Sequence, residues 1–260
     1  MENLRKYGES PFSIAVIHGG PGAPGEMAPV AIELSSRWGI LEPLQTAVSL
    51  EGQFRELYYV LIDNSNLPVT VIGWSWGAML GFILAARCPT IVKKLILVSS
   101  GVFDKRYANK IEQTRLGRLG REEKEKFQSV IKALDDPCFA NKDMLMLNLE
   151  TLMYKTDLYN PLPFKSDVVE YQYNVFRDVW RDAEEFRASG ELLKLRKNIS
   201  CPVVVIHGDY DPHPYMGVEK PLSGTIRDFK FILLENCGHK PWVEKDAMDN
   251  FYYVIKKELL

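Results

Sequence analysis

The sequence predicts an α/β protein with a mostly parallel sheet of about six strands, flanked by helices and interrupted by a helical insert. Three observations lead to this prediction. Short apolar runs rich in β-branched residues alternate with helical patterns. These runs are apolar at almost every position, as expected for strands that are covered on both faces. A charged stretch without such runs separates the two halves of the pattern.

The first half of the predicted core extends to residue 101. Buried strands are expected at 12–18, 69–72 and 92–99, with a weaker candidate at 38–45. Helices are expected at 28–37, 50–62 and 76–88, and Pro89 ends the last of them.

The second half of the core resumes at residue 199. Strands are expected at 202–207 and 229–234, and an amphipathic helix is expected at 247–259. Residues 102–198 between the two halves look mostly helical, and their charge run at 121–126 is expected to be a solvated helix face. We therefore expect a core made of residues 1–101 and 199–260, with residues 102–198 forming a cap or lid.

The composition excludes several classes of protein. The chain has 260 residues, with 32 Lys and Arg against 34 Asp and Glu, which gives a net charge of −2. Nucleic-acid binders and polybasic membrane-surface proteins rely on an excess of positive charge, so neither partner is expected. No apolar run is long enough to cross a bilayer, and the first residues lack the apolar stretch of a signal peptide. Four scattered cysteines suggest neither a zinc site nor a disulfide framework, and a cytoplasmic protein is expected.

The strongest chemical signal is a serine between two glycines, in Gly73-Trp74-Ser75-Trp76-Gly77. This pentapeptide joins a predicted strand to a predicted helix. A serine on such a sharp turn has strained backbone dihedral angles and points its hydroxyl outward. Glycines are needed two positions to either side because strand and helix pass closely there. The context favours a nucleophile over a serine that merely caps a glycine-rich turn.

A serine nucleophile needs a general base, and the chain has four histidines. His239 follows the last predicted strand, at the carboxyl edge of the sheet, where the sites of parallel sheets form. His18 and His207 each end a strand and precede a glycine, so they are expected to shape loops. His213 is the competitor, but it is too near the expected acid in sequence to face that acid and still reach Ser75. We therefore expect His239 to be the base.

The acid that orients the base should lie in a loop at the same edge of the sheet. Asp211 follows the predicted strand at 202–207 and is the expected acid. Asp209 is expected to cap the same turn locally, and Asp104 is a lesser alternative. The resulting order along the chain, serine then acid then histidine, is the one expected for a nucleophile on this kind of turn.

An acyl-transfer site also needs hydrogen-bond donors for the oxyanion that develops on the substrate. One donor should be the backbone N–H of Trp76, directly after the nucleophile. The other should come from the loop His18-Gly-Gly-Pro-Gly22, where Gly19 and Gly20 leave the backbone open, and Gly20 is the expected donor. This loop lacks the Lys-Ser/Thr ending of a nucleotide-binding loop.

Together these motifs resemble the α/β-hydrolase superfamily. The resemblance covers residues 12–101 and 199–260 and implies the α/β-hydrolase fold. The histidine-glycine loop and Trp76 are similar to those of the proline iminopeptidase branch. That family usually has an antiparallel pair of strands before the loop, and this chain is too short there to supply the pair. For this reason we expect six strands rather than eight.

The resemblance implies a small-molecule or short-peptide substrate and neither a metal nor an organic cofactor. Gly19 and Trp74 are expected to contact the substrate, although Trp74 and Met79 are equally compatible with packing around the turn. Iminopeptidases hold the substrate ammonium with cap glutamates. No motif selects among the cap carboxylates of this chain: Glu150, Asp157, Glu170, Glu184 and Glu185. The oligomeric state is left open.

The expected function is hydrolysis of an ester or amide bond through an acyl-enzyme, with an aminopeptidase of the proline iminopeptidase type as the specific expectation. Ser75 would attack, His239 would move the proton and Asp211 would orient His239. A carboxylesterase remains an alternative. A non-catalytic protein that binds a small ligand in the same fold is the other alternative.

Overall fold

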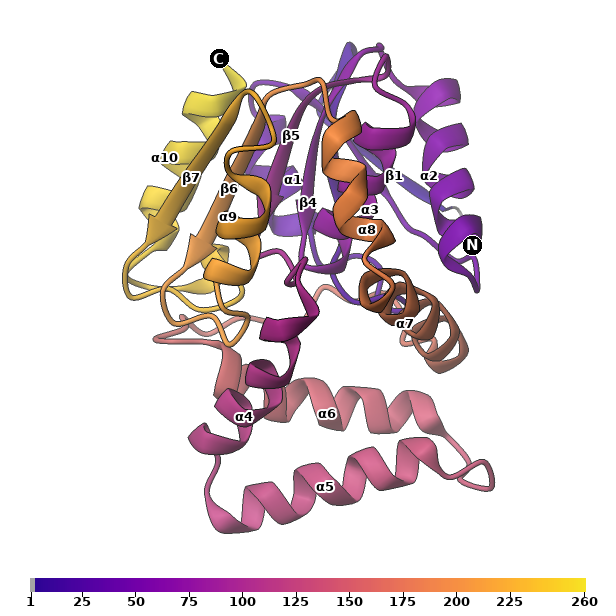
Figure 1. Cartoon of the computed structure of the whole chain (residues 1–260), viewed down its shortest axis with the longest axis vertical. Helices are drawn as coiled ribbons and strands as arrows, with labels where there is room; N and C mark the ends of the chain where they lie inside the picture. Colours follow the sequence, from indigo (N-terminus) through magenta and orange to yellow (C-terminus); the bar gives the residue numbers. More distant parts are fainter. Residues whose placement is uncertain (1–2) are drawn as a thin grey trace.

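One mixed sheet forms the centre of the protein (Figure 1). The computed structural model describes residues 3–260. Within this range seven strands lie in the spatial order β1-β3-β2-β4-β5-β6-β7, and every adjacent pair is parallel except β1 with β3. The strands are β1 (Leu4–Tyr7), β2 (Phe12–Ile17), β3 (Gly39–Pro43), β4 (Val69–Trp74), β5 (Val92–Val98), β6 (Val203–Gly208) and β7 (Phe229–Leu234).

The predicted fold class is confirmed, and all six predicted strands are present. The seventh strand, β1, was not predicted. Its sequence Leu-Arg-Lys-Tyr carries two charges in four residues, and it lies at the edge of the sheet, where none of its side chains is fully buried. Charged side chains are common on edge strands, so such a strand has no apolar signature in the sequence.

Helices cover both faces of the sheet. Their bounds are α1 (Ala28–Ser35), α2 (Leu50–Asn64), α3 (Trp76–Arg87), α4 (Ala108–Arg118), α5 (Arg121–Asp135), α6 (Lys142–Asp157), α7 (Tyr173–Ala188), α8 (Glu191–Lys194), α9 (Met216–Leu222) and α10 (Met248–Leu259). Short 3₁₀ turns add η1 (Lys105–Tyr107), η2 (Leu195–Asn198) and η3 (Pro241–Val243).

Two apolar clusters lie on opposite faces of the sheet. Successive residues of β4 point to opposite faces, so Val71 belongs to one cluster and Ile72 to the other. Helices α2, α3, α7, α8 and α9 contribute to the Val71 cluster, whereas α1 and α10 contribute to the Ile72 cluster. All six residues of β4 are buried, which explains why its sequence is apolar without alternation.

The insert between β5 and β6 consists of helices with two different environments. Helices α5 and α6 form a hairpin at one end of the molecule (Figure 1). They share a small apolar cluster of their own with the end of α4 and the start of α7, made of Leu119, Phe127, Val130, Leu134, Met146, Leu149, Leu152 and Tyr173. Helix α7 also places Val175, Val179 and Ala183 in the Val71 cluster, which is the main cluster of the core. The boundaries of the cap, 102 and 198, stay a prediction.

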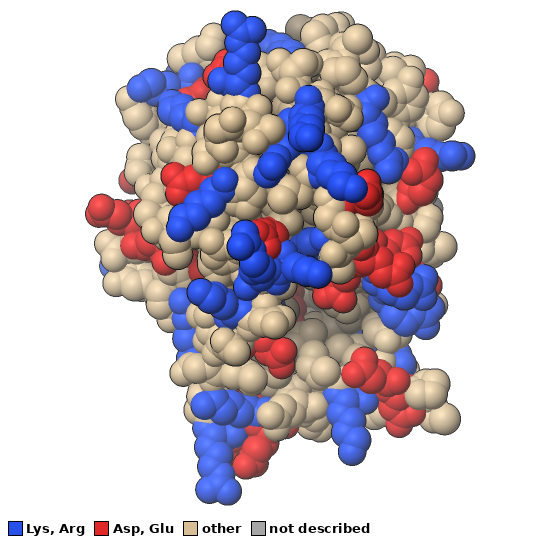
Figure 2. Space-filling view, in the orientation of Figure 1, with Lys and Arg blue, Asp and Glu red and all other residues tan. Residues whose placement is uncertain are grey.

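The charge run at 121–126 forms the start of α5. Its side chains are exposed or half-buried, and the buried residues of the helix, Phe127, Val130 and Leu134, follow it at helical spacing. Figure 2 shows that basic and acidic side chains are interspersed over the visible face of the molecule. In the described part of the chain no helix combines the length and apolarity needed to cross a membrane.

Phe82 tests the contribution of the main cluster to stability. Its side chain is fully buried in α3, and its ring lies 4.6 Å from the ring of Phe103. The substitution Phe82→Ala should lower the free energy of unfolding by about 3–5 kcal/mol, because it leaves a cavity in a packed core. Urea denaturation measures this. Tyr253→Ala, at an exposed position of α10, is the control and should change the free energy by less than about 0.5 kcal/mol. Equal losses in both variants would contradict the prediction.

Candidate active site

Ser75 lies on a tight turn between β4 and α3. Its φ is +53°, in the left-handed region that side chains rarely adopt. A Cβ atom on Gly73 would collide with the backbone of Gly77, and one on Gly77 would collide with the carbonyl oxygens of Ile17 and His18. The two glycines therefore allow β4, α3 and the end of β2 to approach closely, and this close approach holds the serine in its strained conformation.

The structure brings Ser75, His239 and Asp211 into one chain of hydrogen bonds. The His239 Nε2 atom lies 3.0 Å from the Ser75 Oγ atom, and the His239 Nδ1 atom lies 2.8 Å from the Asp211 Oδ2 atom. Because a carboxylate only accepts, Nδ1 of His239 carries the proton and Nε2 is free to accept the serine proton. These are the relative positions of nucleophile, base and orienting acid.

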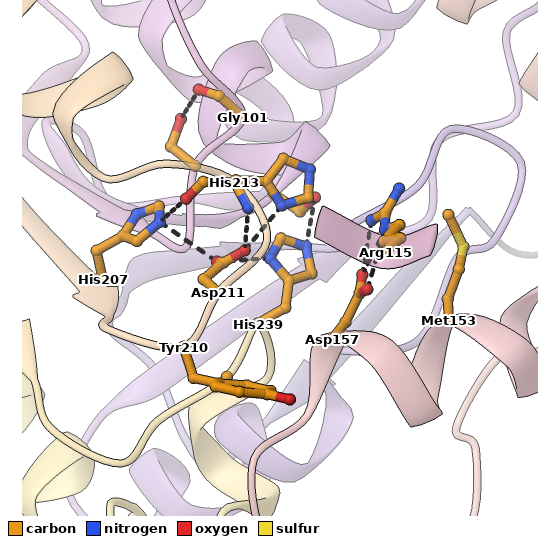
Figure 3. Close-up of polar contacts among 12 residues, drawn as sticks. Gly101, Arg115, Met153, Asp157, His207, Tyr210, Asp211, His213 and His239 are labelled. Carbon is orange, nitrogen blue, oxygen red and sulfur yellow. Dashed lines mark hydrogen bonds and ion pairs between the residues drawn. The ribbon is translucent and has the colours of Figure 1, made fainter. Parts of the chain in front are cut away.

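The Asp211 carboxylate lies in a fully buried position among three histidines (Figure 3). Burial alone would raise the pKa of this carboxyl. The neighbouring imidazoles, with His239 contributing most, outweigh burial and hold the pKa well below its usual range. Asp211 is therefore ionised at neutral pH, as an acid that stabilises an imidazolium must be.

His213 binds the same carboxylate. Both its backbone N–H and its Nδ1 atom lie 2.8 Å from the Asp211 Oδ1 atom. Among the hydrogen bonds of residues 3–260 none joins His213 to Ser75, and the choice of His239 over His213 as the base stays a prediction. Its contact with Asp211 was not predicted from the sequence. Such a contact depends on the path of the loop after β6, which no motif specifies.

The loop after β2 is arranged to present a backbone donor. The His18 Nδ1 atom donates to the carbonyl oxygen of Gly19 at 2.6 Å. In a trans peptide the carbonyl and the next N–H point in opposite directions, so this bond also fixes the direction of the Gly20 N–H. Gly20 has a φ of +38°, which favours glycine. Burial lowers the pKa of His18 to about 4, so its ring is neutral at pH 7.

Trp76 is the first residue of α3, where backbone N–H groups have no partner within the helix. Its indole is almost fully buried and donates to the Gln53 side chain at 3.1 Å. The backbone N–H of Trp76 is thus available beside Ser75 while its side chain anchors α3 to α2. The assignment of Gly20 and Trp76 as the two oxyanion donors stays a proposal.

Trp74 contacts His239 rather than lying free. Its indole N–H donates to the carbonyl oxygen of His239 at 2.7 Å, and the two rings lie 5.3 Å apart. A Cβ atom on Gly19 would collide with the Trp74 ring, so these two residues pack directly on each other. Met79 is buried in the main cluster, so its side chain packs in the core around the turn. Contact of Gly19 and Trp74 with substrate remains a proposal.

The alternative residues have local roles in the structure. Asp209 accepts a hydrogen bond from the backbone N–H of Cys237, which ties the loops after β6 and β7 together. Asp104 caps η1 and pairs with the exposed Arg106. His207 lies at the end of β6, and its Nε2 atom donates to the carbonyl oxygen of His213 at 2.8 Å.

Asp211, His213 and His239 also form the one group within residues 3–260 whose ligand atoms lie close enough together, within 4.8 Å, to suggest a metal ion. Their two N···O separations of 2.8 Å are those of direct hydrogen bonds. A metal ion at about 2.0–2.2 Å from each atom would displace those hydrogen bonds. The geometry therefore fits a proton relay better than a metal centre.

Comparison with protein families agrees with the fold. A family described as alpha/beta hydrolase fold matches residues 55–246, which include Ser75, Asp211 and His239. This chain belongs to the α/β-hydrolase family. The resemblance to the superfamily that the motifs suggested is thereby confirmed. No curated protein matches the chain.

Several solved structures are similar over nearly the whole chain. VinJ has a TM-score of 0.72 at 18% identity, covering 98% of this chain and 93% of its own. A proline iminopeptidase from Mycobacterium smegmatis has a TM-score of 0.63 at 18% identity, covering 98% and 93%. A thioesterase domain from the curacin biosynthetic pathway has a TM-score of 0.60 at 17% identity, covering 97% and 94%. At these identities the likeness shows the fold alone.

In this α/β-hydrolase the insert contacts both loops that carry the candidate relay. Asp157, at the end of α6, accepts a hydrogen bond from the backbone N–H of His239 through its carbonyl oxygen at 2.7 Å. Arg118 donates to the carbonyl oxygen of Tyr210 at 2.8 Å and lies 3.5 Å from the centre of the Tyr210 ring. The loops that hold His239 and Asp211 are therefore each fixed by a residue of the insert.

Asp157 is held in turn by Arg115 of α4. The two side chains form a buried bidentate ion pair, with a shortest distance of 2.6 Å. Burial would raise the pKa of Asp157, but the Arg115 guanidinium outweighs burial and keeps the pKa below its usual value. Sequence reasoning missed Arg115 and Arg118. Their spacing of three residues on one face of α4 is the only signal that could have found them.

Lys240, directly after His239, joins core and insert a second time. Its ammonium pairs with the buried Glu26 at 2.9 Å and donates to the Tyr154 hydroxyl at 3.1 Å. The hydroxyls of Tyr154 and Tyr171 both donate to Glu150. Two carboxylates, Glu26 and Glu150, thus share a network with one ammonium, and the network has a net negative charge when both are ionised.

The buried His18 should make stability depend on pH. Its pKa is about 4 in the folded protein, against about 6.5 in an unfolded chain, so only the unfolded chain takes up this proton between those values. The contribution of His18 to the free energy of unfolding is therefore lost as pH falls from about 6.5 to 4, at up to about 1.4 kcal/mol per pH unit. Asparagine can donate to Gly19 but does not titrate. Denaturation of the wild type and His18→Asn should show a difference in unfolding free energy that decreases over this range. A constant difference would contradict the prediction.

Proposed function

We propose that this protein is a serine hydrolase that cleaves an ester or amide bond of a small molecule or short peptide. The observation that supports the proposal is the hydrogen-bonded series Ser75–His239–Asp211 at the carboxyl edge of the sheet. Membership of the α/β-hydrolase family adds to it. The proposed setting is the cytoplasm, since the four cysteines are all free thiols.

In the proposed reaction Ser75 attacks the carbonyl carbon of the substrate while His239 takes the proton from the serine hydroxyl. Asp211 stabilises the imidazolium that forms. The backbone N–H groups of Gly20 and Trp76 hold the oxyanion of the tetrahedral intermediate, and the loss of such a donor typically lowers kcat by about 10²–10³-fold. His239 then protonates the leaving group. Water next attacks the carbonyl carbon of the acyl-enzyme while His239 takes a proton from it, and His239 returns that proton to the Ser75 oxygen as the acyl group leaves.

The specific candidate is an aminopeptidase of the proline iminopeptidase type, and Glu150 is the residue on which it depends. Of the five cap carboxylates, Asp157 is neutralised by Arg115, Glu184 lies near Arg187, and Glu170 and Glu185 are exposed. Glu150 is half-buried and accepts from two tyrosine hydroxyls, and within the described residues no cation pairs with it. A substrate ammonium would therefore find a carboxylate with uncompensated charge at this position.

The second candidate is a carboxylesterase, in which the Glu26–Lys240–Glu150 network serves only to join core and insert. The similar structures include both a peptidase and a thioesterase, so the likeness in fold is compatible with either chemistry. A non-catalytic ligand-binding protein of the same fold is a third candidate. That candidate predicts equal turnover of model esters by the wild type and Ser75→Ala.

Labelling with a fluorophosphonate probe tests the nucleophile. The probe should add to Ser75, as located by peptide mass spectrometry, because only a serine with an adjacent base is activated at neutral pH. Ser75→Ala should abolish both labelling and hydrolysis of p-nitrophenyl butyrate. Ser36→Ala, at an exposed serine beyond α1, is the matched control and should behave as the wild type. Labelling at another residue, or no labelling, would overturn the proposal.

A substrate pair tests the choice between aminopeptidase and esterase. If the protein is an aminopeptidase, Glu150→Gln should lower kcat/KM for proline β-naphthylamide by about 10-fold or more, because a charge-assisted contact with the ammonium is lost. Turnover of p-nitrophenyl butyrate should be nearly unchanged. Glu170→Gln, on an exposed carboxylate, is the control. Turnover of the ester alone, with no turnover of the amide by any variant, would favour the carboxylesterase.

A further inference from the structure

The Asp211 carboxylate is shared by three imidazoles rather than by one. Its Oδ1 atom accepts from the backbone N–H and the Nδ1 atom of His213, each at 2.8 Å. Its Oδ2 atom accepts from His239 at 2.8 Å and lies 3.4 Å from the Nε2 atom of His207. Within residues 3–260 no lysine or arginine lies within ion-pair distance of Asp211. The orientation of the carboxylate therefore depends on these histidines.

The rings of His213 and His239 are held in the same protonation form. Each Nδ1 atom faces an oxygen of a carboxylate that only accepts, so each ring carries its proton on Nδ1. The His213 carbonyl in turn accepts from His207, which fixes the loop on which His213 lies. His213 is thus bound at its ring, its backbone N–H and its carbonyl oxygen.

The two rings also stack on each other. Their centres lie 4.4 Å apart with an interplanar angle of 26° (Figure 3). Both side chains are about nine-tenths buried, with exposed fractions of 10% for His213 and 11% for His239. A ring that is hydrogen-bonded along one edge and stacked on its face has little freedom to turn about its Cβ–Cγ bond.

We propose that His213 is a positioning residue for the hydrolytic reaction, which clamps the Asp211 carboxylate through Oδ1 and stacks on His239 so that the base faces Ser75. This inference rests on the proposed function. His213 does not contact the reacting atoms and acts through its two neighbours. If it were removed, Oδ1 would keep only the backbone N–H of residue 213, and the carboxylate could rotate away from His239. A misplacement of about 1 Å in such a relay costs about 10²-fold in rate.

His213 must also stay neutral while His239 carries the proton. Two imidazolium rings at a stacking distance would repel each other, with only one carboxylate to compensate them. Burial, the largest effect, lowers the pKa of His213 to about 4, so the proton from Ser75 passes to His239 alone. The other charged and titratable groups around the pair are Asp211 and His207 from the loop and end of β6, Arg115 from α4 and Asp157 from α6.

Two substitutions separate the clamp from the stack. In His213→Phe the ring stays and the donor is lost. In His213→Asn the side-chain amide can still donate to Asp211, because its nitrogen occupies about the place of Nδ1, but the stack is lost. The probe substrate for both is p-nitrophenyl butyrate, with kcat, KM and the pH profile of kcat/KM as readouts.

His213→Phe should lower kcat by about 10- to 100-fold with little change in KM. It should also move the acid limb of kcat/KM to lower pH by about half a unit to one unit, because a carboxylate that has rotated away from His239 stabilises the imidazolium less. His213→Asn should keep the acid limb of the wild type and lose less than about 5-fold in kcat, since the donor is retained. Lys220→Ala, an exposed position on α9, is the control.

Wild-type kcat and pH profile in both folded variants would overturn the inference and leave the proposed function intact. Absence of any hydrolysis or probe labelling by the wild type would overturn both. If the phenylalanine variant does not fold, the wild type supplies a test of its own. ¹⁵N spectra of histidine-labelled protein at pH 7 should show the ring signals that disappear in His213→Asn as a neutral imidazole protonated on Nδ1. A ring protonated on Nε2, or one that is charged at pH 7, would overturn the inference.

Discussion

The negative charge of Asp211 is buried, no lysine or arginine of the described residues 3–260 pairs with it, and this is the constraint on which the candidate site depends. Burying a carboxylate is expensive unless hydrogen bonds replace its water. Here the hydrogen bonds come from His213 and His239, which belong to the loops after β6 and β7, and His207 at the end of β6 lies 3.4 Å from the same carboxylate. Solvating this one charge thus requires two loops to meet, and their meeting places the ring of His239 at Ser75.

The insert takes part in the same arrangement. Asp157 binds the backbone of His239, and Arg118 binds the backbone next to Asp211, so both loops are held from the insert as well as from the sheet. Arg115 holds Asp157 in a bidentate pair. The orientation of His239 is therefore a property of the assembled molecule, and a change in the position of α4 or α6 would reach its imidazole through these contacts.

The features that could be predicted from the sequence are those that neighbouring residues determine. The turn at Ser75 is specified by its neighbours, since only glycine fits at positions 73 and 77 between strand and helix, and the six predicted strands are specified by their largely apolar runs. Edge strand β1 has no such run. The contacts of Arg115 and Arg118 join residues far apart in the chain, and the spacing of the two arginines on α4 is a signal too weak to identify their partners. The second bond of Asp211 depends on loop geometry, which leaves no pattern in the sequence.

The division of the insert between two apolar clusters has a consequence for how this architecture can be altered. Helices α5 and α6 bury their side chains mainly against each other, whereas Val175 and Val179 of α7 and Leu192 of α8 are part of the central packing. Removal of the whole insert would expose to water the core residues that pack against these three side chains. The outer part of the α5–α6 hairpin is instead the natural unit of exchange, because this α/β-hydrolase fold can vary there while the central packing and the contacts of Asp157 are kept.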